Sequence, residues 1–246
     1  MIRGIVYWFC GSLLTFFFFI FLIIVTPFLR NRRDFYRNVI RIWAKILLRV
    51  FCSVKTETRG MENLLENAPC VIVSNHRSFM DIIVGLAVVP VQFRWFAKRS
   101  LFRIPVIGTA MRMAGYVSVE RGKSRSASKS LLEAERALAQ GDSLWVFPEG
   151  TRTRGEELGP FKRGAFHIAM DTGRPLVPVS LAHTDKIFVK PFVIKPRLIR
   201  VVVDRPLYHG MEGDGRKTAR ESMHAITDSV RRVIQRNYDA SISPAR

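Results

Sequence analysis

Two short stretches of the chain carry residue types that suit proton transfer and anion binding. The first, Ser74–Asp81, contains a histidine, His76, with an aspartate, Asp81, five positions later. Histidine is the usual proton acceptor near neutral pH. A carboxylate that holds the far ring nitrogen fixes the tautomer and stabilises the imidazolium formed during reaction. We therefore predict that His76 is a general base and Asp81 its partner.

The spacing restricts how these two side chains can meet. Five residues of continuous helix turn through about 500°, which leaves the side chains some 140° apart. Ser78 suits an N-cap, which would make Asp81 the third helical residue, where capping carboxylates fold back toward the preceding turn. His76 would then end a strand just before this helix, within reach of Asp81. A bare HxxxxD pattern is common, however, and also fits a capping aspartate with a loop histidine.

The second stretch, Phe147–Arg152, reads FPEGTR and follows a predicted strand. Gly150 permits an unusual backbone turn. Thr151 and Arg152 present a hydroxyl and a forked guanidinium that suit phosphate. Lys162 adds a cation at the start of the next predicted helix, where backbone N–H groups also favour anions. This pattern predicts an anion site.

Another arginine, Arg121, follows another predicted strand. Ligands of open α/β sheets sit at the carboxyl ends of the strands. Between Gln92 and Arg125, eight basic residues accompany a single acid, Glu120. Most of these cations are typical of a solvated surface, and among the arginines we expect Arg121 and Arg152 to bind the anion.

From about Val54 short apolar runs alternate with helical stretches. Strands are expected at Cys70–Val73, Phe93–Ala97, Tyr116–Val119, Leu144–Phe147, Leu176–Leu181 and Leu198–Val203. Helices are expected at Phe79–Val88, Ile104–Ala114, Ser126–Gln140, Gly164–Met170 and Thr218–Arg236. The stretch from His183 to Arg197 is expected to be a surface loop or flap. Interleaved strands and helices predict an α/β fold with a mixed, largely parallel sheet flanked by helices.

An N-terminal hydrophobic, membrane-anchoring helical segment is expected before this sheet. Gly4–Leu29 contains no charged residue, and about 20 apolar residues suffice to cross a bilayer core. A cleaved signal peptide fits less well, because the run is too long and most of the charge follows it. Arg30, Arg32 and Arg33 come directly after the run and only Arg3 before it, which predicts that the rest of the chain is cytoplasmic.

A second helix is expected from Phe35 to Phe51. Its basic stripe would be Arg37, Arg41, Lys45 and Arg49, and its apolar face Val39, Ile42, Trp43, Ile46, Leu47 and Val50. Such a helix suits the headgroup layer over anionic lipid, although an amphipathic helix docked on its own domain has the same pattern. We predict membrane-associating helices in residues 1–53 and a catalytic domain in residues 54–246.

Composition narrows the choice of partners. The formal net charge is +19, from 39 Lys+Arg and 20 Asp+Glu, which favours nucleic acid, an anionic membrane face or polyanionic substrates. The sequence has no nucleic-acid-binding motif, so we expect no nucleic-acid partner. The three cysteines show no CxxC spacing, which argues against a disulfide framework and against a metal site.

With these residues in place, the chain resembles the glycerolipid acyltransferase family, and most closely the bacterial 1-acyl-sn-glycerol-3-phosphate acyltransferases. Asn75–Asp81 resembles the NHxxxxD block, Gly115–Arg121 the second block, Phe147–Arg152 the FPEGTR block and Val177–Val179 the proline-containing fourth block. One departure is visible, because the second block commonly ends in Asp-Arg and here contains Glu120. The longer acid keeps the charge, so we expect the role of the following arginine to survive.

The resemblance implies transfer of an acyl group from acyl-CoA or acyl-carrier protein to the sn-2 hydroxyl of 1-acyl-glycerol-3-phosphate, giving phosphatidic acid. It implies the catalytic residues His76 and Asp81. It implies phosphate binding by Arg121, Glu149, Gly150, Thr151 and Arg152. Further candidates for substrate binding are Asn75, Lys98 and Lys162. No metal, other cofactor or acyl-enzyme is expected, since no nucleophile-elbow or Walker pattern occurs.

Other functions stay open at this point. The acceptor could be lyso-ornithine lipid, another lysophospholipid or glycerol-3-phosphate. A non-catalytic membrane protein that binds anionic lipid would share the basic surface but would leave the ordered blocks unexplained. The expected location is the bacterial inner membrane, with the catalytic domain on the cytoplasmic side, in contact with an anionic membrane surface.

Overall fold

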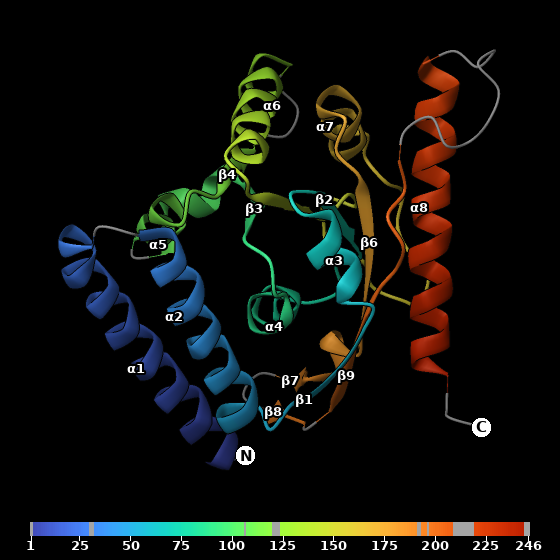
Figure 1. Ribbon diagram of the computed structural model, residues 1–246. Helices are drawn as coiled ribbons and strands as arrows, with labels where there is room; N and C mark the ends of the chain where they lie inside the picture. The colour runs from blue at the N-terminus through green and yellow to red at the C-terminus, as the bar shows by residue number, and fades with distance from the viewer. Residues whose placement is uncertain are drawn as a thin grey trace. The chain divides into compact units, whose positions relative to one another are not determined.

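The computed structural model describes residues 2–29, 32–105, 107–119, 124–190, 193–195, 197–208 and 219–243. The chain divides into two compact units, and each unit is assembled from separate segments of sequence. Unit 1 comprises Met1–Glu57, Ser78–Val89 and His183–Arg200. Unit 2 comprises Thr58–Arg77, Pro90–Ala182 and Val201–Arg246. Figure 1 shows the elements along the chain.

A seven-stranded sheet forms the centre of the fold, in the order β1-β9-β6-β2-β5-β3-β4. Its strands are β1 (Lys55–Arg59), β2 (Val71–Ser74), β3 (Phe93–Lys98), β4 (Val117–Val119), β5 (Ser143–Val146), β6 (Leu176–Ala182) and β9 (Leu198–Val203). β2 pairs in parallel with β5 and β6, and β3 with β4 and β5. Every residue of β2, β5 and β6 is buried, as expected for parallel strands that are covered on both faces. The predicted α/β fold with a largely parallel sheet is confirmed.

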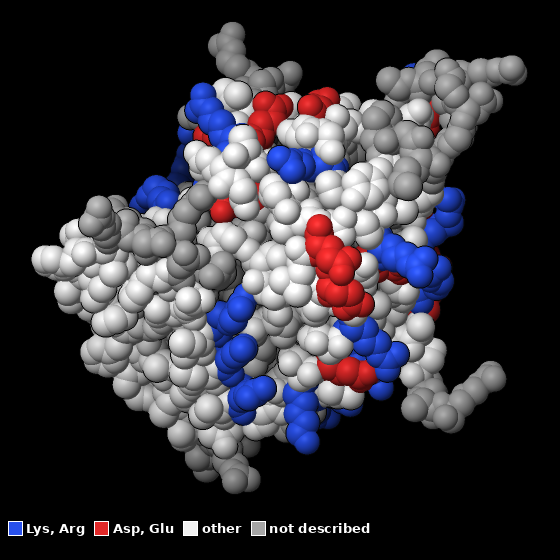
Figure 2. Space-filling view, viewed as in Figure 1, with Lys and Arg blue, Asp and Glu red and all other residues white. Residues whose placement is uncertain are grey.

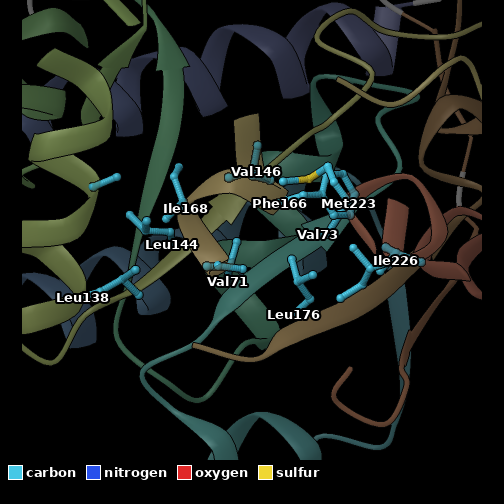
Figure 3. Close-up of a cluster of buried hydrophobic side chains, with 14 of the residues drawn as sticks. Val71, Val73, Leu138, Leu144, Val146, Phe166, Ile168, Leu176, Met223 and Ile226 are labelled. Atoms are coloured by element: carbon cyan, nitrogen blue, oxygen red, sulfur yellow. The ribbon is translucent and has the colours of Figure 1, made fainter. Parts of the chain in front are cut away.

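One face of the sheet in unit 2 is aliphatic and lies under helices. The helices are α6 (Ser124–Ala139), α7 (Gly164–Thr172) and α8 (Ala219–Ile242). The strands contribute Val71, Val73, Leu144, Val146 and Leu176, and the helices contribute Leu138, Phe166, Ile168, Met223 and Ile226 (Figure 3). Because strand side chains alternate between faces, Ile72 and Ser74 must point to the other side.

That other face is aromatic. Trp145 of β5 lies against Trp95 and Phe93 of β3, with ring centroids 4.6 Å and 5.2 Å away. The indole Nε1 of Trp145 donates a hydrogen bond of 2.7 Å to Ser74 Oγ. Phe147 extends the row beyond the end of β5, stacked on Trp95 at 5.1 Å. The row therefore leads from the sheet core toward the carboxyl ends of the strands.

Unit 1 contains the N-terminal helices α1 (Ile2–Val25) and α2 (Arg32–Ile46), a π-helical turn (Leu47–Phe51), α4 (Met80–Val88) and a two-stranded antiparallel sheet of β7 (Phe188–Lys190) and β8 (Val193–Ile194). The buried Trp43 joins α2 to α1, because its ring stacks on Phe18 at 5.5 Å and its Nε1 lies 3.4 Å from Thr15 Oγ1. Within unit 1, α1 and α2 thus lie side by side (Figure 1).

α1 has the composition of a membrane helix. The helical stretch Gly4–Phe28, which includes most of α1, is long and apolar enough to cross a bilayer, and only 11% of its most apolar window is buried. Its exposed side chains include Phe9, Leu13, Phe16, Phe17, Ile20, Phe21, Ile23 and Ile24. The surface over α1 is uncharged in Figure 2. Such a surface is consistent with the predicted membrane association.

α2 has features of both alternatives, a helix in the headgroup layer and a helix docked on its own domain. Of the predicted apolar face, Trp43 is buried, whereas Ile42, Ile46 and Val50 are exposed. Arg41, a member of the predicted basic stripe, donates a hydrogen bond to the Val89 carbonyl after α4 and so takes part in packing within unit 1. One part of the helix therefore docks on its own unit and another part leaves apolar side chains uncovered.

Other elements differ locally from the prediction. The expected helix at 104–114 begins later, as α5 (Ile107–Met113), after a 3₁₀ turn, η3 (Arg99–Arg103). The expected flap contains β7 and β8. β1 and the short α3 (Glu62–Asn67) are not predicted by apolar periodicity, because β1 reads KTETR and has the polar composition of an edge strand. The division at residues 53 and 54 stays a prediction.

Candidate active site

His76 lies just beyond the carboxyl end of β2, where Asn75 fixes the chain. Asn75 is fully buried, and its side chain donates to the Leu181 carbonyl at 2.9 Å and accepts from the Leu181 N–H at 2.8 Å. Both polar groups of the amide are thus used to join the end of β2 to β6. This geometry favours a positioning role for Asn75, and its contact with substrate stays a prediction.

The imidazole of His76 ends the aromatic row. It stacks on the ring of Phe147 with centroids 4.0 Å apart and an interplanar angle of 14°. Phe147 in turn is nearly parallel to Trp95, at 17°. Stacking on a ring that is itself packed restricts the imidazole plane, while the half-buried His76 side chain keeps access to solvent.

Glu149 ties the backbone of His76 to the FPEGTR turn. The His76 N–H donates to Glu149 Oε1 at 2.7 Å. The other oxygen, Oε2, accepts the Thr153 hydroxyl and the Gly159 N–H, the latter at 3.1 Å. The Thr153 N–H returns to the His76 carbonyl at 2.9 Å. Glu149 is only 5% exposed, so the geometry favours a scaffold role for this carboxylate, and its predicted phosphate contact stays untested.

The turn brings cations to the same place. Gly150 has a φ of +72°, a conformation that favours glycine. The Lys162 N–H donates to the Pro148 carbonyl at 2.9 Å. The Lys162 side chain lies along Gly150, since a Cβ added there would be 3.0 Å from its Nζ. Arg152 is exposed on the same turn, so an anion could meet two cations and the Thr151 hydroxyl here.

Asp81 lies in the first turn of α4, in unit 1. Its Oδ2 accepts the Ser78 N–H at 2.8 Å, and Ser78 Oγ accepts the Met80 N–H at 3.2 Å. The predicted fold-back of Asp81 toward Ser78 is therefore seen, but the helix begins at Met80, so Phe79 rather than Ser78 takes the N-cap position and Asp81 is the second helical residue. The pairing of this fully buried carboxylate with His76 stays a prediction.

Two candidates remain, Lys98 and Arg121. Lys98 is exposed at the end of β3, and Arg121 lies outside the described residues. The residues that unit 2 brings together at the carboxyl edge of its sheet are Asn75, His76, Glu149, Gly150, Thr151, Arg152 and Lys162.

The sequence patterns do not predict a further set of contacts, made by α8. Gln235 accepts the Leu158 N–H through Oε1 at 2.8 Å and donates to the Glu156 carbonyl through Nε2 at 3.2 Å. Arg231 donates to the Leu158 carbonyl at 2.7 Å. These side chains form hydrogen bonds with both N–H and C=O groups of the loop after Arg152, as a neighbouring strand would.

Arg77, the residue after His76, also contacts this loop. Its guanidinium donates to the Glu156 carbonyl and lies over the ring of Tyr238, 4.5 Å from the centroid. Arg77 and Tyr238 are both buried. α8 thus fixes the loop that closes around Glu149, and the signal that could have revealed this is only the apolar periodicity of a C-terminal helix.

The buried thiols do not suit nucleophilic catalysis. Burial raises the pKa of Cys70 to about 11, against a weaker lowering effect of its hydrogen bond with Ser143. Burial also raises the pKa of Cys52 to about 11. A thiol with such a pKa is almost entirely protonated near neutral pH. Across the described parts of the chain, no group of His, Cys, Asp and Glu side chains has the arrangement of a metal site.

Comparison with known proteins identifies the family. Residues 55–182 match the family model described as Acyltransferase. A chloroplastic 1-acyl-sn-glycerol-3-phosphate acyltransferase of Brassica napus is 38% identical over 82% of this chain and 60% of its own length. The enzyme of that name from Borreliella burgdorferi is 32% identical over 63% of this chain and 62% of its own. The chain belongs to the acyltransferase family, and it spans about three-fifths of the length of these relatives.

A solved structure supports the fold. The crystal structure of the 1-acyl-sn-glycerophosphate acyltransferase PlsC from Thermotoga maritima aligns with a TM-score of 0.72 over 98% of this chain and 100% of that one, at 24% identity. The segment matched by the family model runs from β1 to β6, so it contains His76 and the FPEGTR turn but not α8.

Proposed function

We propose that this protein transfers a fatty acyl group from an acyl thioester to the sn-2 hydroxyl of 1-acyl-sn-glycerol-3-phosphate, giving phosphatidic acid. Its relatives from a plant and from a bacterium bear the name of that enzyme. The observation that carries the proposal is the pair of backbone hydrogen bonds that join His76 to the FPEGTR turn. These bonds support the proposal, because they join the residue proposed as the base to the turn that carries the proposed phosphate-binding cation Arg152.

The reaction needs no group beyond the two substrates and the side chains. The acceptor phosphate binds Arg152 and Lys162, with Arg121 as a further candidate, and the free hydroxyl lies against His76. His76 takes the hydroxyl proton as the oxygen forms a bond to the thioester carbonyl carbon. The C–S bond then breaks, and the imidazolium returns the proton to the leaving thiolate. Asp81 is proposed to stabilise the imidazolium.

Direct attack is preferred to an acyl-enzyme. General-base assistance is worth about 10²- to 10⁴-fold, and holding two substrates in register can contribute more. The described thiols offer no alternative route, because Cys52 and Cys70 are buried and Cys10 lies in the apolar α1. The donor is proposed to be acyl-CoA or acyl-carrier protein, with no resident metal or other cofactor.

The acceptor is a membrane lipid, which agrees with the apolar α1. We propose that the protein resides in the bacterial inner membrane, with unit 2 on the cytoplasmic side, where soluble acyl thioesters are available. The cationic residues after the apolar run favour that orientation.

The test is thiol release and phosphatidic acid formation by the purified chain with 1-acyl-sn-glycerol-3-phosphate and acyl-CoA. The His76→Ala variant should lose at least about 100-fold in turnover, since it loses its base. His167, on α7, provides a matched control as His167→Ala. Wild-type turnover by His76→Ala would refute the base assignment.

The same assay separates the acceptors. A lysophospholipid without a terminal phosphate, lyso-ornithine lipid and glycerol-3-phosphate are each supplied in place of the acceptor. If a non-phosphorylated acceptor is the better substrate and Arg152→Ala leaves that activity unchanged, the lysophosphatidate proposal is wrong and that acceptor replaces it.

A further inference from the structure

One exposed surface of unit 2 combines bulky apolar side chains with arginines, and the proposed chemistry does not use it. It is formed by η3 and α5 and is called here the η3–α5 surface. Its apolar side chains are Leu101, Ile104 and Ile107, which are 37%, 41% and 46% exposed. Its arginines are Arg99, Arg103 and Arg112, all exposed. Clustered side chains of this kind mark a contact site more often than scattered ones do.

The sequence around this surface contains no acid. From Gln92 to Val119 there is no aspartate or glutamate. Within this stretch Arg94 is paired with a carboxylate, because its Nε lies 2.6 Å from Asp142 Oδ2. Positive charge beside exposed leucine and isoleucine suits an anionic lipid surface, because cations bind headgroup phosphates and apolar side chains enter the boundary below them.

The surface is preformed. η3 and α5 touch at Gly108, where an added Cβ would lie only 2.2 Å from the Phe102 carbonyl oxygen. Arg112 donates to the same carbonyl and, at 3.0 Å, to Thr109 Oγ1. The two short helices therefore hold Ile104 and Ile107 in fixed relation without a partner.

Its place in the sheet connects it with the site. η3 begins directly after β3, which pairs in parallel with β5, and β5 pairs in parallel with β2. The chain therefore leaves β3 at the same edge of the sheet at which His76 follows β2 and the FPEGTR turn follows β5. A lipid surface at this edge would present an acceptor headgroup at the same edge of the sheet as His76.

We propose that the η3–α5 surface is a second membrane contact, distinct from α1 and α2, that lies in the headgroup layer of an anionic bilayer. Leu101, Ile104 and Ile107 enter the boundary between headgroups and acyl chains, and the arginines bind lipid phosphates. The proposal rests on the proposed function for its lipid acceptor, but the contact itself requires no turnover.

The experiment places an environment-sensitive fluorophore on this surface. Ile104→Cys is made together with Cys10→Ser, because Cys52 and Cys70 are buried and should not be labelled. The matched control carries Arg232→Cys, at an exposed position on α8. Full-length protein is bound to vesicles of phosphatidylglycerol with phosphatidylcholine, or of phosphatidylcholine alone.

In the phosphatidylglycerol vesicles the probe at position 104 should shift its emission to the blue, resist aqueous iodide several-fold better than the control, and be quenched by nitroxide lipids. The effect should weaken in phosphatidylcholine alone. Equal iodide access at positions 104 and 232 would overturn the proposal. If vesicles do not protect the probe but an acidic carrier protein protects it in their absence, the proposal is overturned in favour of a protein partner.

A second arm separates this proposal from the catalytic one. The labelled protein that also carries His76→Ala should insert its probe as before. Loss of turnover with retained insertion then tests the role of His76 as the base and leaves the membrane contact unaffected. In an otherwise wild-type chain, Leu101→Ser with Ile107→Ser should lower turnover several-fold on vesicle-borne acceptor. Turnover on detergent-dispersed acceptor should not change. Equal loss in both assays would indicate damage to the fold and contradict a membrane role.

Discussion

The two halves of the site are held in different ways. His76 is fixed by the stacked Phe147 ring and by backbone bonds to the buried Glu149 and to Thr153. Arg152, in contrast, is exposed on its turn. A base must be aligned before the substrate arrives, because a displaced base lowers the rate steeply. A cation that binds phosphate is best left solvated until then, because burying an unpaired charge is costly.

This difference teaches where each kind of damage should appear. Changes to the buried scaffold should lower kcat and stability together, since the same hydrogen bonds serve both. Changes to the exposed cations should raise KM for the phosphorylated acceptor and leave stability unaltered. Each of the following variants tests one side of this contrast.

The largest effect is expected from Glu149→Gln. The amide keeps one acceptor oxygen, but its NH₂ group would face the N–H of His76 or the donors on the other side. Leaving such a buried donor unsatisfied costs about 1–3 kcal/mol, and displacement of a base by about 1 Å can cost 10²-fold in rate. We expect kcat to fall about 100-fold and the melting temperature to fall with it. Thiol release and thermal unfolding measure both.

The control for this change is Glu157→Gln, because Glu157 is an exposed carboxylate on the same loop. It should behave as wild type in both assays. A Glu149→Gln protein with wild-type kcat and stability would show that the buried half is not a scaffold.

The opposite pattern is expected from Arg152→Gln. Hydrogen bonds to charged groups contribute about 1.5–3 kcal/mol, so KM for 1-acyl-sn-glycerol-3-phosphate should rise about 10- to 100-fold. Thermal unfolding should be unchanged, because the side chain is exposed. Arg154→Gln, two residues further along and also exposed, is the control. A lowered melting temperature with an unchanged KM would reverse the assignment of the exposed half.

Sequence patterns predict the contents of this site better than its supports. His76 and the FPEGTR turn can be recognised in the sequence because their residue types suit proton transfer and anion binding. Their proximity can be predicted because parallel strands bring their carboxyl ends to one edge of a sheet. That Glu149 binds backbone N–H groups could not be predicted, because the sequence is the same whether this glutamate supports the backbone or contacts the substrate. Only the hydrogen bonds distinguish the two.

Elements with strong apolar periodicity are likewise predictable, and polar ones are not. β2, β5 and β6 appear as buried runs, whereas β1 reads KTETR and is recognised only through its place in the sheet. α2 shows a different limit, since periodicity places Trp43 and Ile46 on one apolar face but cannot say which of them is covered. That depends on which neighbour the helix meets, a tertiary property.

A smaller effect is expected from Gln235→Ala on α8, which supports the scaffold from a distance. The Leu158 N–H would lose its partner, and the buried polar group would cost about 1–3 kcal/mol. The loop would loosen around Glu149, so kcat should fall several-fold while KM for the acceptor changes little. Arg232→Ala, on the exposed side of the same helix, should leave kcat and stability at wild-type values. A KM effect alone would place Gln235 with the substrate-binding half.

The smallest effect concerns Cys70, at the amino end of β2 and therefore away from His76. Its folded pKa of about 11, against 9.0 for an ordinary thiol, means that between these values the folded state keeps a proton that the unfolded state releases. Stability is thus full below pH 9 and falls as pH rises toward 11, by about 1 kcal/mol at pH 10. Denaturant unfolding of Cys70→Ala should show a shallower loss over this range than the wild type. Its turnover at pH 8 should not change, because the thiol helps the scaffold only through burial; a loss of turnover at constant stability would instead connect Cys70 with the chemistry.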